Sequence, residues 1–185
     1  MYIQQTHFIG VTVPDALSQT LEECRTWMHE QYGCRSGYST PIHITLIPPF
    51  HLEESYHEEQ LLESVCAAGA RCAGQSLFPF TVPVDGFGSF AERTLFAHVC
   101  SGGSWEALRN AVYDELLARC PGCVQRDRRP FTPHLTIANR DIPAGAVPEA
   151  LRHLSELELH TEFSADTIAV FKRQNGRWLI AGTYC

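Results

Sequence analysis

The alternation of apolar and polar residues divides the chain into short strands and amphipathic helices. Apolar residues spaced three or four positions apart predict helices from Asp15 to Gly33, over 58–72, after Ser104 and over 147–157. Runs rich in apolar residues predict strands over 7–13, 43–46, 78–90, 94–100, 134–137, 163–171 and 178–184. Asp15 and Ser104 can cap their helices, and Gly33 is a typical helix end. Turns are expected at Gly86 and Gly88 and at a 174–176 hairpin.

The order strand, helix, strand, helix, strand occurs twice, over halves of about 1–91 and 92–185. Equivalent positions are similarly spaced: Phe8 precedes His43 by 35 positions, and Phe96 precedes His134 by 38. Such a repeat predicts two similar lobes related by an approximate two-fold axis, with the 134–137 strand facing the 43–46 strand. No linker rich in Ser, Gly or Pro separates the halves, so we expect residues 1–185 to form one bilobal domain.

The sequence His-hydrophobic-Thr-hydrophobic occurs once in each half. The copies are His43-Ile44-Thr45-Leu46 and His134-Leu135-Thr136-Ile137, and each closely follows a proline. Because alternate side chains of a strand point to opposite faces, each His shares a face with its Thr. Two such faces brought together would offer two imidazoles and two hydroxyls to one ligand.

Composition and charge narrow the class of ligand. The 185 residues are 44% hydrophobic and 19% charged, as in an ordinary folded protein, and the net charge is −7. This charge argues against tight binding of long nucleic acid through its phosphates. It does not exclude a nucleotide or an RNA end bound in a basic pocket, and arginines 126, 128, 129 and 140 crowd the second motif.

The remaining composition predicts a cytoplasmic protein without a membrane segment. Residues 1–7 lack the basic start and apolar run of a signal peptide, and no stretch approaches the roughly 20 apolar residues that span a bilayer. The eight cysteines are therefore expected to be structural, and the Cys120–Cys123 pair lacks a second pair to complete a zinc site. The compact bilobal arrangement needs no partner, so we expect a monomer.

Two histidines on opposite sides of a phosphorus atom can divide one reaction. Histidine has an unperturbed pKa near 6.5, so one ring can take a proton from the attacking water or hydroxyl and the other can protonate the leaving oxygen. The threonine hydroxyls can hold the non-bridging oxygens. No metal is needed if the nucleophile is already positioned.

Other interpretations of the histidines were weighed. A single His-x-Thr is weak evidence, but two copies at matching places in a repeat favour a catalytic pair. A metal pair is the main rival, although neither motif has an Asp, Glu or Cys at ligand spacing. The seven other histidines are expected to be structural or on the surface, with His7 and His98 the least certain.

At these residues the chain resembles the two-histidine (2H) phosphoesterase superfamily, in its 2′-5′ RNA ligase (LigT-like) and 2′,3′-cyclic phosphodiesterase branch. The stretches that carry the resemblance are 43–50 and 129–137, with support from 8–11, 86–90 and the Trp178 hairpin. The resemblance implies an α+β bilobal fold, in which antiparallel sheets carrying helices on their outer faces surround a central cleft. It also implies metal-independent chemistry without a cofactor.

On this resemblance His43 and His134 would be the acid/base pair, and Thr45 and Thr136 would hold the phosphate. Related ligase-type sequences often place an arginine five positions after the second histidine. That position is Asn139 here, and the arginine follows it. A one-residue offset reverses the face of a regular strand, so Arg140 would reach the phosphate only if the strand ends or bulges. Arg129 is the alternative phosphate contact.

We expect the substrate to be a small 2′,3′-cyclic or 2′-linked phosphodiester of a nucleotide or RNA end. Aromatic residues near the motifs can stack on a base or belong to the core, and Phe90 and Phe131 are the candidates for stacking. Hydrolysis is favoured over joining of RNA halves, because ligation of large RNAs would favour a broad basic surface. Two alternatives stay open: 2′-5′ RNA ligase activity, and a module that binds nucleotide phosphates without catalysis.

Overall fold

The computed structural model describes residues 4–184, so the expectations for residues 1–3 and Cys185 lie outside it. The helices are α1 (Asp15–Tyr32), α2 (Glu58–Gly74), α3 (Gly103–Arg119) and α4 (Val147–Ser155). The strands are β1 (His7–Thr12), β2 (His43–Phe50), β3 (Phe80–Phe90), β4 (Thr94–Val99), β5 (His134–Asn139), β6 (His160–Ala165), β7 (Ile168–Gln174) and β8 (Arg177–Tyr184). Within this part of the chain, no helix is long and apolar enough to cross a membrane.

The strands form an antiparallel array in the order β6-β3-β4-β5-β2-β1-β7-β8. Its centre is narrow, because β2 and β5 pair only through Ile44 and Leu135. This junction separates a β2 lobe (β2, β1, β7, β8) from a β5 lobe (β5, β4, β3, β6). The predicted α+β bilobal fold is confirmed, but the two expected sheets are one eight-stranded sheet, joined at this residue pair.

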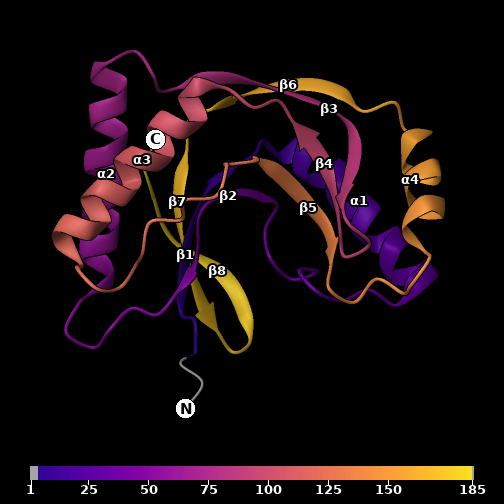
Figure 1. Cartoon of the computed structure of the whole chain (residues 1–185), viewed down its shortest axis with the longest axis horizontal. Coiled ribbons are helices and arrows are strands. Elements are labelled where there is room, and N and C mark those ends of the chain that lie inside the picture. The colour runs from indigo at the N-terminus through magenta and orange to yellow at the C-terminus, as the bar shows by residue number, and fades with distance from the viewer. Residues whose placement is uncertain (1–3, 185) are drawn as a thin grey trace.

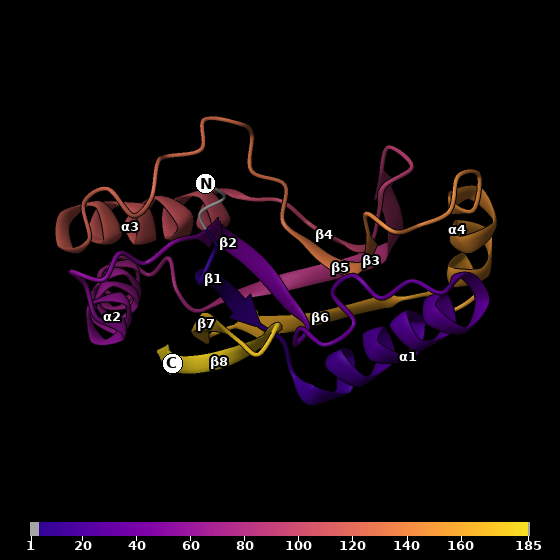
Figure 2. The ribbon, with the colours of Figure 1, turned by 90° about the horizontal axis from the view of Figure 1, so that it is seen from below.

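Each lobe draws its elements from both halves of the sequence. Strand β3 pairs with β4 and β6, whereas β7 returns to pair with β1 and carries β8 with it. The helices cross in the same way: α1 packs against β5 and α3 against β2. Figures 1 and 2 show the result, with α2 and α3 at the end of the β2 lobe and α1 and α4 at the opposite end. The crossing ties the two lobes together.

Two predicted strands differ from the structure. The expected 163–171 strand is wrong, because the chain leaves the β5 lobe after Ala165 and enters the β2 lobe at Ile168. The turn expected at Gly86 and Gly88 is also wrong, because β3 continues through both residues. A shift in register between Val84 and Phe87 marks a bulge there, and Gly86 adopts φ +67°, which a glycine accommodates without strain.

The helix ends follow the sequence signals only in part. Gly33 ends α1 in the left-handed conformation, as predicted, and its N–H bonds to the His29 carbonyl. Asp15 does not cap α1, because the cap position is Pro14 and Asp15 lies inside the first turn. Likewise α3 begins at Gly103, one residue before the expected Ser104 cap.

Helix α2 continues through Gly69 to Gly74. The absence of a side chain at Gly69 has a packing reason. A Cβ there would lie 2.1 Å from the Tyr184 ring, and a Cβ on Gly182 would lie 2.5 Å from the Leu62 side chain. These contacts bring α2 directly onto β8 and fix the helix against the β2 lobe.

Candidate active site

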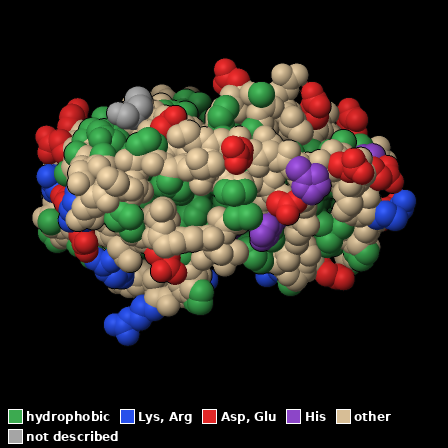
Figure 3. All heavy atoms as spheres, turned by 90° about the horizontal axis from the view of Figure 1, so that it is seen from above, with side chains coloured by type: hydrophobic (Ala, Val, Ile, Leu, Met, Phe, Trp, Pro, Cys, Tyr) green, Lys and Arg blue, Asp and Glu red, His purple; other side chains and the backbone are tan. Residues whose placement is uncertain are grey.

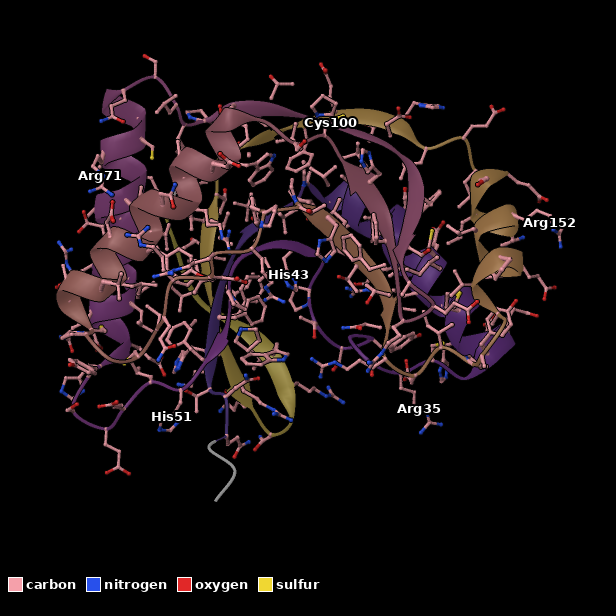
Figure 4. The ribbon with its side chains drawn as sticks, in the orientation of Figure 1. Arg35, His43, His51, Arg71, Cys100 and Arg152 are labelled. Atoms are coloured by element: carbon pink, nitrogen blue, oxygen red, sulfur yellow. The ribbon has the colours of Figure 1, made fainter. Side chains whose placement is uncertain are left out.

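His43 and His134 begin the two central strands of the sheet. The residues that follow them, Ile44 and Leu135, form the junction pair, so the two histidines lie on the same face of neighbouring strands. Both line one cavity of about 440 Å³, together with Thr45 and Thr136. Figure 4 shows His43 near the centre of the molecule, between the lobes. The structure therefore brings together the four side chains that the repeated motif singled out.

Each imidazole is held by the same backbone contact. The Nδ1–H of His43 donates to the Pro41 carbonyl at 2.7 Å, and that of His134 donates to the Thr132 carbonyl at 2.8 Å. A carbonyl only accepts, so the neutral rings carry their proton on Nδ1. This leaves Nε2 of each ring available to accept a proton or, when the ring is charged, to donate one.

Aromatic rings support both histidines in a pseudo-symmetric way. The His43 ring lies 4.6 Å from Phe8 on β1 and 5.0 Å from Phe171 on β7. The His134 ring lies 5.3 Å from Phe96 on β4 and 5.0 Å from Phe90 on β3. In each lobe the support comes from the neighbouring strand and the next strand beyond it.

Burial favours the neutral form of both imidazoles. Desolvation lowers the pKa of His43 to about 4, with smaller contributions in the same direction from Arg25 and His134, against the hydrogen bond to Pro41. Burial also lowers the pKa of His134 below its ordinary value, opposed by the bond to Thr132. An anion bound between the rings would raise both values, because it favours the charged forms.

Arg25 reaches the site from the buried face of α1. Its Nη2 and Nε donate to the Thr136 carbonyl at 2.9 and 3.3 Å, and its Nη1 donates to the Thr40 carbonyl. The same guanidinium pairs with Glu22 at 3.1 Å. The residue is 3% exposed. Arg25 thus joins the strand of the second motif to the loop that leads into the first.

Arg140 was expected to reach the phosphate only if its strand bulges or ends before it, and β5 does both. One residue of β5 is unpaired between Thr136 and Ala138, which is a bulge, and the strand ends at Asn139. Arg140 then turns into a left-handed conformation with φ +74°, and its N–H bonds to the Arg93 carbonyl. Asn139 and Arg140 both line the cavity.

The cavity is basic although the chain is acidic. Arginines 25, 35, 140 and 173 line it, and no Asp or Glu within residues 4–184 lines it. The Arg35 side chain extends outward, away from His43 (Figure 4). Elsewhere the surface is mixed: acidic side chains are scattered over the face in Figure 3. The positive charge is thus concentrated where an anion would bind.

Arg129 lies in a second cavity, of about 290 Å³, that shares Thr45 and His134 with the first. The side chain forms a forked contact with Asp127, whose Oδ2 lies 2.7 Å from Nη2. Arg129 does not line the first cavity. The two arginines proposed for phosphate binding therefore line different cavities.

Phe90 and Phe131 both line the second cavity but differ in availability. Phe90 is 40% exposed and meets His134 edge to face. The face of the Phe131 ring is covered by the Arg109 guanidinium at 4.9 Å, and Trp105 lies 6.3 Å from it. Phe90 is the ring that is free to receive a base.

The remaining histidines lie outside these cavities. His7 is buried beside Glu58 at 3.6 Å, and burial lowers its pKa, whereas His98 is exposed. The cysteines at 24, 34, 66, 72, 100, 120 and 123 are free. Over residues 4–184, no three His, Cys, Asp or Glu side chains are arranged to hold a metal ion.

The match to a known family agrees with this geometry. Residues 13–177, which include both motifs, match the model of the 2′-5′ RNA ligase superfamily. The chain belongs to this superfamily. The resemblance to two-histidine phosphoesterases is thereby confirmed.

Individual relatives support the assignment. A curated RNA 2′,3′-cyclic phosphodiesterase from Geobacillus stearothermophilus is 32% identical over 155 residues, and the chain spans about 42% of the length of that relative. The crystal structure of TT0787 from Thermus thermophilus superposes with a TM-score of 0.61, at 25% identity, over 97% of this chain and 96% of that one. E. coli LigT complexed with 3′-AMP gives 0.60 at 17% identity, over 97% of both chains.

Sequence reasoning missed several residues of this superfamily member's site. Arg25 lies on the buried face of α1, between Leu21 and Met28. A charged residue among apolar ones on a helix face is visible in the sequence and could have marked Arg25 as a candidate. Gly10 lies against the first motif: a Cβ there would be 2.7 Å from the Ile44 carbonyl oxygen and 3.3 Å from the His43 ring. Arg173 and Trp178, which line the first cavity, carry no such signal.

Proposed function

We propose that this protein is a metal-independent phosphodiesterase that opens a 2′,3′-cyclic phosphate on a small nucleotide or RNA end. The observation that carries the proposal is the junction pair between Ile44 and Leu135. Because β2 and β5 are antiparallel, it sets His43 and His134 diagonally across the two strands on one cavity wall, with a threonine two positions after each. The family of the chain and the activity named for its curated relative agree with this chemistry.

The proposed reaction uses both rings once. One imidazole accepts a proton from water as the water oxygen forms a new bond to phosphorus. The bond from phosphorus to the 2′ or 3′ oxygen breaks, and the other imidazole gives its proton to that leaving oxygen. The product is a phosphomonoester beside a free hydroxyl. The lower pKa of His43 favours it as the base and His134 as the acid.

The threonines and one arginine complete the proposed phosphate site. Thr45 and Thr136 line the cavity on the same face as the histidines, where their hydroxyls can donate to the non-bridging oxygens. Arg140 supplies a positive charge beyond the end of β5. Arg25 is already committed to two backbone carbonyls, so it acts through position and charge and not through direct contact.

The experiment is turnover of guanosine and adenosine 2′,3′-cyclic phosphates by the purified chain, followed by ³¹P NMR with and without EDTA. The proposal predicts conversion to a nucleoside monophosphate at the same rate in both conditions. Failure to open either substrate would overturn the phosphodiesterase assignment. Loss of turnover in EDTA that a divalent metal restores would overturn the metal independence.

A ligase and a simple binder are the alternatives. Incubation with RNA halves distinguishes a ligase from a phosphodiesterase, because a 2′-5′ joined product would show that the reaction runs toward ligation. Calorimetry with nucleoside monophosphates, beside the turnover assay, separates the second. Tight binding without turnover would favour a binding module. The two imidazoles weigh against that alternative, since a binder gains nothing from two groups poised to exchange protons.

A further inference from the structure

The second cavity has a different chemistry from the first. Both include Thr45 and His134, so a phosphate held between the two histidines reaches both cavities. The second is walled by Phe90 and Phe131 and by a cluster of Arg109, Asp127 and Arg129. An aromatic wall beside fixed polar groups suits a nucleobase better than a second phosphate.

Arg129 is held in one orientation although its side chain is 83% exposed. Its Nε lies 3.0 and 3.1 Å from the two carboxylate oxygens of Asp127, and its Nη2 lies 2.7 Å from Oδ2. The backbone N–H of Arg129 also donates to Oδ1 at 3.0 Å, and Arg109 approaches the same carboxylate at 3.7 Å. Arg129 holds the pKa of Asp127 well below its usual range, so the carboxylate that it contacts is charged at neutral pH.

The orientation leaves donors free. Asp127 engages the Nε and Nη2 side of the guanidinium, and within residues 4–184 no acceptor contacts Nη1. A guanidinium presents its N–H groups as a rigid planar fork. The unused part of the fork therefore offers fixed donors at the mouth of the cavity, at little further cost in conformational entropy.

Phe90 provides a platform next to these donors. By pseudo-symmetry it takes the place that Phe171 takes beside His43, yet Phe171 is fully buried and Phe90 is 40% exposed. Phe171 lies beneath Phe8, which Trp178 covers in turn. Phe96 packs against Phe90 at 4.3 Å without enclosing it. The exposure of Phe90 is thus a local departure from the symmetry of the site.

We propose that Phe90 and Arg129 form a nucleobase subsite that favours guanine over adenine, with the phosphate placed as in the proposed function. Guanine presents two neighbouring acceptors, O6 and N7, which match the paired donors of an arginine. Adenine presents N7 beside the N6 amino group, and that amino group opposes the arginine donor. The two purines stack equally well, so only the edge distinguishes them.

The test compares kcat/KM for guanosine and adenosine 2′,3′-cyclic phosphates. Wild type is expected to favour guanosine by about fivefold or more. Arg129→Lys keeps the charge but loses the fork, and Arg129→Gln loses both, so each brings the ratio close to one. Arg128→Gln is the matched control, because Arg128 is an exposed neighbour that lines neither cavity, and it should keep the wild-type ratio. Equal rates in wild type, or a preference that survives in Arg129→Gln, would overturn the subsite.

Phe90→Leu separates stacking from edge recognition. Stacking does not depend on which base is bound, so this variant should weaken both substrates by about tenfold and leave their ratio unchanged. A Phe90→Leu enzyme with wild-type KM for both substrates would place the base elsewhere and contradict the proposal.

Calorimetry with guanosine and adenosine 2′-monophosphates tests the subsite without turnover. Tighter binding of the guanosine compound in wild type, lost in Arg129→Gln, supports the subsite even if no cyclic phosphate is opened. Equal binding, with turnover intact, overturns the subsite and leaves the proposed function standing. The two proposals can therefore fail separately.

Discussion

Arg25 and Thr136 join the first helix to the second motif. The guanidinium donates twice to the Thr136 carbonyl, at 2.9 and 3.3 Å, from a position that is 3% exposed. Thr136 belongs to the β5 lobe and follows His134 by two residues. The same arginine donates to Thr40, three residues before His43. The buried Arg25 guanidinium thus holds the backbone close to both histidines.

Replacing Arg25 should impair activity more than folding. Arg25→Gln leaves the Thr136 carbonyl with a weaker donor and removes a charge that lowers the pKa of His43. Without that charge the His43 pKa rises, so the acid limb of the kcat/KM profile moves to higher pH, and kcat falls by about tenfold or more. Arg25→Lys should restore the position of the acid limb, because it keeps the charge.

Arg71→Gln is the control for a lost arginine on a helix. Arg71 also donates to a backbone carbonyl, that of Ala111 at 3.0 Å, and pairs with Asp114. It lies on α2, at the edge of the molecule in Figure 4 and far from His43. An unchanged pH profile in Arg25→Gln, or the same shift in Arg71→Gln, would show that Arg25 serves stability alone.

Gly10→Ala should displace the first motif. The added Cβ would lie 2.7 Å from the Ile44 carbonyl oxygen, which is backbone, so β1 and β2 must separate locally. Forcing a methyl group into a packed site costs about 1–3 kcal/mol, and urea unfolding measures this loss. Gly74→Ala, where a Cβ meets nothing within 4 Å, should unfold like wild type. Equal stability of the two variants would contradict the close approach.

The motif threonines should affect kcat and not stability. Thr45→Val and Thr136→Val each remove a hydroxyl assigned to the non-bridging oxygens, and each should lower kcat by on the order of 10². Thr81→Val, on the exposed side of β3, should match wild type. Steady-state kinetics beside thermal melts makes the comparison. A variant of either motif threonine with wild-type kcat would remove that residue from the phosphate site.

Acid should destabilise the fold through His43. Its folded pKa, about 4, lies below the unfolded value near 6.5, so between these pH values the unfolded chain binds more protons. The contribution of His43 to the free energy of unfolding is therefore fully present above pH 6.5. It falls as the pH drops toward 4, by up to roughly 1.4 kcal/mol per pH unit. His43→Gln should make this decline shallower in urea titrations. The decline that remains should come from His7 and His134, whose pKa values burial also lowers. A decline of unchanged slope would show that His43 is not desolvated.

Local signals in the sequence predicted most elements and the motif residues that meet at the site. The motifs are visible because a strand repeats every two residues, so His and Thr at i and i+2 must share a face. The register between β2 and β5 was not predictable in detail. It depends on a single pair, Ile44 with Leu135, that joins residues 91 positions apart.

The misses have a common physical origin in long-range packing. Residues 163–171 are rich in apolar side chains, but β6 pairs with β3 and β7 with β1, so the segment divides between the two lobes. The glycine at position 69 of α2 is likewise explained only by packing, because a Cβ there would lie 2.1 Å from the Tyr184 ring. The contribution of Arg173 and Trp178 likewise depends on β7 and β8 returning to the β2 lobe.

The most direct test of the account is a double-mutant cycle on the two histidines. Turnover of a nucleoside 2′,3′-cyclic phosphate is measured for wild type, His43→Ala, His134→Ala and the double variant, with circular dichroism to confirm folding. If both imidazoles act on one phosphorus atom, each single variant loses about 10²- to 10⁴-fold in kcat, and the double variant loses far less than the product of the two. Full activity in either folded single variant would contradict the account.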